Sequence, residues 1–372
     1  MNFPSITLQG NIISTETLDK ISKEEIDFQR SIDFGFKKDI KVRDEVGLAY
    51  AISRGYWNSF RLKVERLNPE DSATTETRNF WMIPFLTELG YTVEKANQEN
   101  INNKSYAISH RAQNLGRFPI HIAGIRQELD KRDANTQTRI SAHGLAQEYL
   151  NVTDDHLYAI VTNGKFLRIL RDSSRLAKLA YVEFNLEKIF EENLFSDFAI
   201  LFRLLHASRM PQKIGEGELA IFEQYHQLSL ESGNRIRENL RREVKNSLDL
   251  LGAGFLNSKL NPEFTQAVQE RKIEAKPNYD TLLRTIYRLL FLIVAEERKL
   301  IYPEDAKNTS QRKIYFDYYS IERLRRLAQK RQFVEKDKYD LWEGLKATFK
   351  LFEVNGYGKP LGIEPLGGTL FS

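Results

Sequence analysis

The chain has 372 residues, a formal net charge of +4 and an ordinary globular composition, with 41% hydrophobic and 28% charged residues. Because single hydrophobic cores stop growing at about 250 to 300 residues, this length predicts two domains. No cysteine occurs, which excludes disulfides, thiolate zinc sites and cysteine nucleophiles and favours a cytoplasmic location. No stretch approaches about 18 consecutive apolar residues, so we expect no membrane contact.

The first 70 residues predict a helical arm, since apolar residues recur at helical spacing from Val46 to Val64. Thr75 is the expected N-cap of a following helix that ends at Gly90. Pro84 lies inside this helix and should kink it or divide it into two pieces.

The period of the apolar residues then changes from helical to strand-like. We expect a helix over 142–150 and strands over 91–95, 118–123, 157–162, 166–170 and 181–184. Asn163 and Gly164 lie between two apolar runs and predict a hairpin with a type I′ turn, in which both residues take positive φ. These elements predict a mixed α/β domain over 71–190.

Helical patterns replace the strands after residue 190 and predict an all-helical domain over 191–355. The span from Leu282 to Val294 is apolar nearly all round, which is typical of a buried central helix. Residues 356–372 are rich in glycine and proline and read as a linker toward a further domain. The expected fold class is therefore α+β: a helical arm, a mixed α/β domain and a helical domain.

None of the possible cofactor or metal motifs in the sequence lies in the structural context that its function requires. The segment SLDLLGAGFLN (247–257) superficially resembles the glycine loop that receives S-adenosylmethionine, but a helical pattern leads into it. We interpret it as a helix C-terminus, with Gly252 and Gly254 permitting left-handed geometry. The six histidines lack metal-ligand spacing, so His121 is expected in an apolar strand and His206 as a packing or capping residue.

One stretch resembles the core of PD-(D/E)XK nucleases. The matching segments are ETRNFWMIPFLTELGY (76–91), QEYLN (147–151) and VTNGKFLRILRD (161–172). The resemblance implies an Asp on one strand and a Glu-x-Lys on the next, because paired carboxylates must hold magnesium. That spacing is missing around FPIHIAG (118–124), so we expect a catalytically degenerate core. The residues to test are Glu76, Glu128, Asp130, Lys131 and Gln147.

A wider resemblance covers residues 76–372. The succession FPIHIAG, ELDKR, QEYLN, VTNGKFLRILRDSS, DFAILFRLLHASR and PLGGTLF is similar to the N-terminal region of large type IIG-like restriction-modification methyltransferases specific for adenine in DNA. This resemblance implies that methyltransferase and target-recognition domains follow, with S-adenosylmethionine as their cofactor and other phage-defence proteins as partners. The chain itself lacks the Asn-Pro-Pro-Tyr or Asp-Pro-Pro-Tyr base clamp, so it would engage DNA and organise domains without methylating.

Two helical stretches concentrate the basic residues. Residues 322–338 hold seven basic and three acidic residues, and residues 235–245 hold five and two. Phosphate contacts with double-stranded DNA are expected from the following residues: Arg323, Arg326, Lys330, Arg241 and Arg242. The alternative is a solvated helix face with ion pairs at i,i+4.

Two other functions remain open at this level. A magnesium-dependent DNA endonuclease requires Glu76, Glu128 and Asp130 to converge within reach of one metal ion. A protein-interaction module of a defence complex requires a contiguous apolar surface patch without a basic groove.

Overall fold

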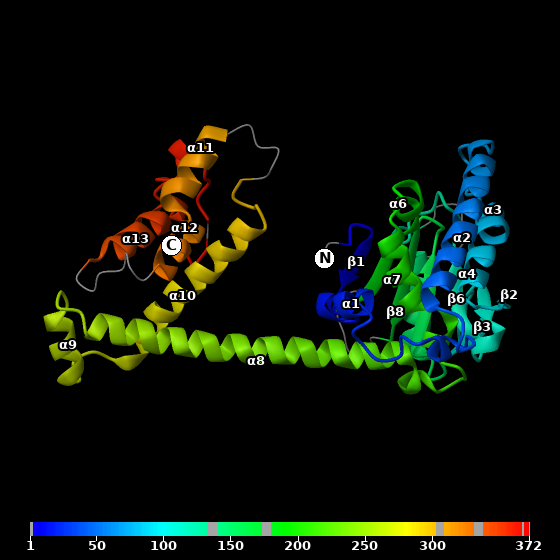
Figure 1. Ribbon diagram of the computed structural model, residues 1–372, viewed down its shortest axis with the longest axis horizontal. Coiled ribbons are helices and arrows are strands. Elements are labelled where there is room, and N and C mark those ends of the chain that lie inside the picture. Colours follow the sequence, from blue (N-terminus) through cyan, green and yellow to red (C-terminus); the bar gives the residue numbers. More distant parts are fainter. Residues whose placement is uncertain are drawn as a thin grey trace. The chain divides into compact units, whose positions relative to one another are not determined.

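The structure is a computed structural model, and it describes residues 3–132, 140–172, 180–302, 309–330, 338–366 and 368–371. The chain divides into two units, Met1–Ile236 and Arg237–Ser372, which are described separately here (Figure 1). None of the helices in these ranges is long and apolar enough to cross a membrane.

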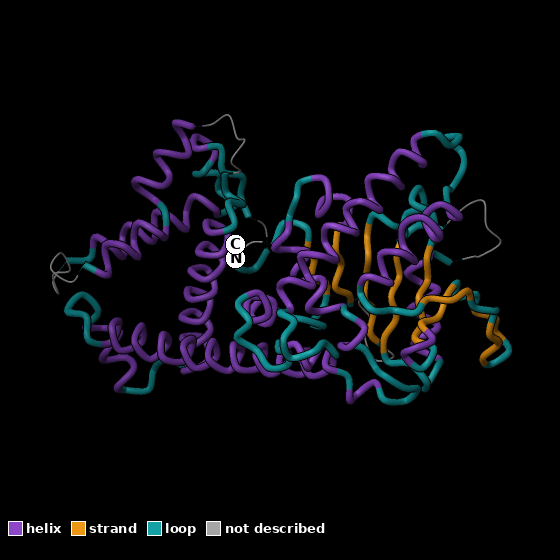
Figure 2. Tube along the Cα trace, turned by 45° about the vertical axis from the view of Figure 1, so that its right-hand side comes forward, coloured by secondary structure: helices purple, strands orange, loops and turns teal. Residues whose placement is uncertain are grey.

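A seven-stranded sheet forms the centre of the first unit (Figure 2). Its order, as described, is β1 (Ile6–Gln9), β9 (Tyr181–Asn185), β8 (Phe166–Arg171), β7 (Tyr158–Thr162), β6 (Phe118–Ile122), β5 (His110–Ala112) and β2 (Val93–Lys95). Among the described strand pairs of this sheet, only β6–β7 is parallel, with Ile120 opposite Ile160. Helix α5 (Ala142–Val152) makes the crossover that a parallel pair needs. A separate hairpin joins β3 (Glu99–Ile101) to β4 (Lys104–Tyr106).

The side chains of β7 alternate between two cores. Tyr158 and Ile160 face the larger core, whereas Ala159 and Val161 face a smaller core that α5 covers. The larger core also receives side chains from α1 (Thr15–Ser22), α2 (Val42–Glu65), α4 (Ile83–Glu88), α6 (Leu186–Glu191) and α7 (Phe195–Leu205). Short 3-10 helices occupy Ser31–Phe34, Gln113–Leu115, Ala207–Arg209, Gly217–Leu219 and, in the second unit, Lys359–Leu361.

The helix expected before Gly90 is divided, as Pro84 predicted. A short α3 (Thr74–Glu76) continues as a π-helical segment, Thr77–Met82, and Pro84 lies in the first turn of α4. The backbone stays helical through Met82 and Ile83, so Pro84 lies where the π-helical segment passes into α4. The prediction of Thr75 as N-cap was wrong: Thr75 lies inside α3, and Ala73 takes the cap position with φ +54° and no side-chain cap.

The hairpin at Asn163–Gly164 is confirmed, but its turn type was wrong. Among these two residues only Gly164 has positive φ, at +85°. The Asn163 side-chain oxygen accepts the backbone N–H groups of Lys165 at 3.1 Å and Phe166 at 2.9 Å. These two hydrogen bonds close the turn through the Asn163 side chain, so Asn163 does not take the positive φ that a type I′ turn requires.

The expected domain boundaries differ from the units in the structure. Residues 6–9 are not part of a helical arm, since β1 pairs antiparallel with β9 at the edge of the sheet. The predicted helix between Val46 and Val64 is α2. At the other end, Phe222 and Tyr225 of α8 (Ile221–Leu256) are buried in the larger core, which moves the boundary from residue 190 to residue 236.

The second unit is helical in its described part. After the second half of α8 come α9 (Pro262–Gln269), α10 (Ala275–Glu297), α11 (Thr309–Ile314) with a π-helical extension Tyr315–Tyr319, α12 (Ile321–Gln329) and α13 (Asp340–Phe352). Their core includes Ile363 and Phe371, which are 4% and 1% exposed. Part of the segment expected as a linker is therefore packed in this core, because its apolar side chains find partners there.

Two further expectations about this unit were wrong. α10 is buried on one face only, since Tyr287, Phe291 and Val294 are exposed while Leu292 is buried. The segment 247–257 does contain a helix C-terminus, since α8 ends at Leu256, but Gly252 and Gly254 lie inside the helix and do not take the expected left-handed geometry.

Candidate nucleic-acid interface

A row of cations runs along the C-terminal half of α8. Arg237, Arg241 and Lys245 follow one another at intervals of four residues, which places them on one side of the helix about 6 Å apart along its axis. All three are exposed, and within the described ranges none of them forms an ion pair. We call these three residues the α8 stripe.

Other cations of the same basic run have partners. Arg235 contacts Glu16 of α1 at 3.1 Å, and Arg242 contacts Glu243 at 3.4 Å. The side chains of the Arg242–Glu243 pair are 66% and 62% exposed, so the attraction is weak.

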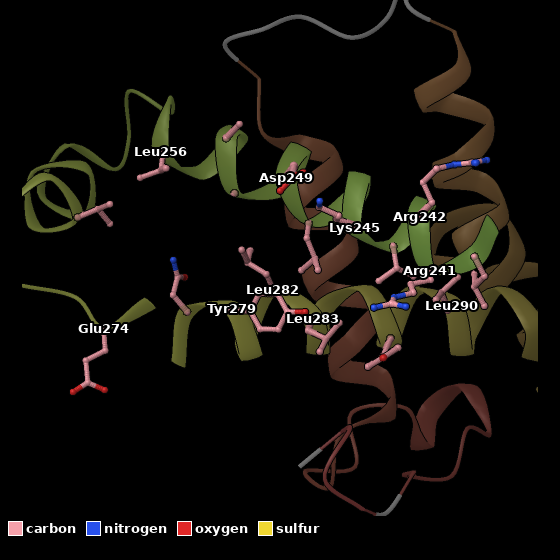
Figure 3. Close-up of a pocket in the computed structure, with 18 of the residues that line it drawn as sticks. Arg241, Arg242, Lys245, Asp249, Leu256, Glu274, Tyr279, Leu282, Leu283 and Leu290 are labelled. Carbon is pink, nitrogen blue, oxygen red and sulfur yellow. The ribbon is translucent and has the colours of Figure 1, made fainter. Parts of the chain in front are cut away.

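The α8 stripe borders a groove between α8 and α10 with a volume of about 1400 Å³ (Figure 3). In the figure the Arg241 side chain points from α8 into the groove. The groove is lined by five cations and three acids, a net charge of +2: Arg237, Arg241, Arg242, Lys245 and Arg271 against Glu238, Asp249 and Glu274. Its apolar floor includes Leu240, Val244, Leu248, Leu282, Leu283 and Leu290.

Two tyrosines of α10 also line this groove. Tyr279 and Tyr287 are 51% and 49% exposed, so roughly half of each residue faces solvent. Figure 3 shows Tyr279 beside Leu282, on the side of α10 that faces α8. Neither tyrosine was predicted to bind a ligand: Tyr287 lies in the span from Leu282 to Val294 that was expected to be buried, and Tyr279 lies just before this span. Arg284 lies between the two tyrosines in the sequence and is exposed. A charged residue at this position was the sign that one side of α10 faces solvent.

The predicted DNA-binding residues of α12 are less well placed. Arg326 is exposed, but Arg323 is half-buried, and Lys330 lies at the C-cap, where the helix has ended. Only Arg323 and Arg326 of the three therefore lie within the helix. The rest of this basic run, 331–337 with Glu335, lies outside the described residues.

Two of the three predicted catalytic carboxylates, Asp130 and Glu128, have a cation as partner. Asp130 receives two hydrogen bonds from Arg168, at 2.6 and 2.8 Å, and the Arg168 guanidinium lowers the pKa of the Asp130 carboxyl. Glu128 contacts Lys131 at 2.9 Å, with both side chains largely exposed. A carboxylate whose oxygens already accept hydrogen bonds from a guanidinium is poorly available to magnesium.

The structure does not assemble the five nuclease candidates. Glu128 and Lys131 line one small cavity of about 170 Å³, and its described lining includes none of the other three. Glu76 ends α3, and Gln147 donates from α5 to the backbone oxygen of Arg171 in β8, at 3.0 Å. No three histidine, aspartate or glutamate side chains are grouped as metal ligands in the part of the chain that the structure describes.

The same small cavity contains Arg78, which the sequence did not single out. Arg78 donates two hydrogen bonds to the carbonyl oxygen of Ile122, at 3.0 and 2.8 Å. Burial, followed by the charge of Arg78, lowers the pKa of His121 to about 4, and the buried Nδ1 of His121 has no hydrogen-bond partner in the structure. A guanidinium beside a neutral imidazole disfavours a divalent cation at this point, because like charges repel.

His206 takes the packing and capping role expected of it. Its Nδ1 accepts the backbone N–H of Ser208 at 3.3 Å, and its ring packs against Phe34 and Phe36.

Comparisons of the chain with protein-family models, with curated proteins and with solved structures give no match.

Proposed function

We propose that this chain is a DNA-engaging and domain-organising region of a restriction-modification type adenine-specific DNA methyltransferase that acts in bacterial phage defence. The observation that carries DNA engagement is the α8 stripe, whose three exposed cations form no ion pairs in the described structure. Cations without protein partners are free to replace the counterions that surround DNA phosphates.

The first unit supports a restriction-endonuclease-like scaffold. In support of it, helix α4 precedes strands β2 to β6 in the chain, and helix α5 lies between β6 and the β7–β8 hairpin. The contacts of Asp130 with Arg168 and of Glu128 with Lys131 support a degenerate core, in which former catalytic positions serve stability. S-adenosylmethionine and base recognition then belong to other domains of the methyltransferase.

The proposed contact is independent of base sequence. Arg237, Arg241 and Lys245 would bind phosphates, and phosphate contacts position a protein on DNA without reading bases. Releasing counterions from three phosphates gives the binding constant a salt dependence with a logarithmic slope of about −2.7 on duplex DNA.

The test is the salt dependence of binding to fluorescent duplexes of about 20 base pairs, between about 50 and 200 mM salt. Changing Arg237, Arg241 and Lys245 together to alanine should weaken binding equally for unrelated sequences. It should also reduce the magnitude of the salt slope by about 2.7.

The matched control changes Arg323, Arg326 and Lys330 to alanine, which removes the same charge from α12 and its C-cap in the same unit. A larger effect of the α8 variant than of the α12 variant supports the α8 stripe as the contact. An unchanged affinity and salt slope in the α8 variant, with its circular dichroism intact, would overturn the proposal.

A further inference from the structure

We propose that the groove between α8 and α10 binds a single-stranded stretch of nucleic acid, with its phosphates on the α8 stripe and its bases against Tyr279 and Tyr287. The inference rests on the proposed function, because it takes the α8 stripe as a phosphate-binding surface. It adds the form of the nucleic acid that the groove accepts.

The first argument is that charge and apolar surface lie side by side. Arg237, Arg241 and Lys245 line a groove whose floor is made by leucines of both helices. A duplex keeps its bases stacked inside and offers phosphates outside, so it would use the cations and leave the leucine floor uncovered. A single strand has a charged backbone and free base faces, and it can cover both surfaces at once.

The second argument is the position of the tyrosines. Tyr279 and Tyr287 are eight residues apart on α10, about 12 Å along the helix axis, and each is about half exposed. Aromatic side chains beside a cationic row are the usual platform for unstacked bases, since every base has a face that can stack on a ring. The spacing leaves room for separate bases on the two rings.

The third argument is the asymmetry of the groove. The α8 stripe lies on one helix and the tyrosines lie on the other, with the apolar floor between them. This arrangement fits a strand, which has a backbone on one side and bases on the other.

The experiment measures the anisotropy of fluorescent oligothymidine and oligouridine of about 12 nucleotides and of a duplex of the same length, in one buffer. We expect the single strands to bind more tightly than the duplex, with the two arms distinguishing DNA from RNA. Changing Tyr279 and Tyr287 to alanine should weaken single-strand binding about five- to 100-fold for each base that loses its platform. Duplex binding should be unchanged.

The control changes Tyr279 and Tyr287 to phenylalanine, which keeps both rings and removes only the hydroxyls. Near wild-type single-strand binding in this variant, together with the loss in the alanine variant, supports stacking. If the duplex binds as tightly as the single strands and the alanine variant changes neither affinity, this inference fails while the proposed function stands.

If no nucleic acid binds, the inference and the proposed function both fail. Binding of an amphipathic peptide rich in leucine and glutamate, competing with no nucleic acid, would also overturn the inference and assign the groove to a protein partner.

Discussion

The indole Nε1–H of Trp81 donates a hydrogen bond to the carbonyl oxygen of Gly164, at 2.8 Å and fully buried. This bond connects the π-helical segment before Pro84 to the β7–β8 turn, 83 residues later in the sequence. The Trp81 ring also packs against Trp57 and Phe190 in the larger core. The turn is thus a buried junction of the first unit.

Gly164 should therefore be intolerant of a side chain. A Cβ at this position would lie 2.9 Å from Thr77 Cγ2 and 3.0 Å from Trp81 Cδ1, at a φ of +85°. We expect Gly164→Ala to lower the free energy of unfolding by about 2 to 4 kcal/mol, from left-handed strain and overpacking. Gly55→Ala is the matched control, because Gly55 is exposed in α2 with nothing within 4 Å. Urea unfolding should show the control stabilised by up to about 1 kcal/mol.

Asp130→Ala should act on stability. It removes two hydrogen bonds from Arg168, a guanidinium that is 7% exposed and keeps Glu183 as its remaining carboxylate partner. We expect a loss of about 1 to 2 kcal/mol in unfolding free energy, measured by urea titration at neutral pH. Glu128→Ala removes a neighbouring carboxylate from an exposed pair and should change stability by less than about 0.5 kcal/mol. Equal effects of the two variants would contradict a structural role for Asp130.

The first unit should lose stability in mild acid. Burial is the main cause that lowers the pKa of five histidines from the ordinary 6.5 to about 4, namely His110, His121, His143, His156 and His206. Between about pH 4 and 6.5 the unfolded chain binds protons that the folded chain excludes, so stability rises with pH in this window.

Each of these histidines contributes about 1.4 kcal/mol per pH unit within that window. We expect urea midpoints to fall clearly from pH 7 to pH 5. His206→Gln removes one of the five histidines that titrate in this window. The change in its unfolding free energy between pH 7.5 and pH 5 should therefore be smaller than that of the wild type by the contribution of one histidine. Comparing each protein with its own stability at pH 7.5 removes the effect of the substitution itself. A flat profile between pH 7 and pH 5 would contradict the prediction.

Glu296 of α10 should be essential to the second unit. Its buried carboxylate accepts hydrogen bonds from the Tyr315 hydroxyl and from the backbone N–H groups of Ile321 and Glu322, at 2.7, 2.7 and 2.9 Å. Glu296→Ala leaves all three donors unpaired and should cost about 3 kcal/mol. Glu297→Ala, at a side chain that is 67% exposed, is the control and should be nearly neutral in thermal unfolding.

Local patterns predicted the elements whose partners are close in sequence. Asn163 and Gly164 identified a hairpin because its two strands adjoin the turn, and Pro84 identified the division of a helix. β1 could not be recognised, since its four residues pair only with β9 at the other end of the unit. β5, with the sequence HRA, was missed because three residues without alternation give no period.

The candidate site was predictable only in part. The sequence identified a basic run in α8, but the ion-pair partners of its members depend on tertiary structure: Arg235 meets Glu16, while Arg237 has no such partner in the described chain. The two tyrosines of α10 could not be recognised as part of a site, because the helical period of apolar residues is the same whether they face a core or a groove. Arg168, which binds Asp130, lies on a strand and gave no sign of its partner.

The pairing of β1 with β9 has a consequence for synthesis. The ribosome releases residues 6–9 long before residues 181–185. β1 therefore has no partner strand until β9 is made, when most of the unit has already been synthesised. Until β9 is made, the edge of β8 is open, and an open strand edge can pair with strands from other chains. Without residues 6–9 the outer edge of β9 would stay unpaired, so β1 protects this edge from pairing with strands of other chains.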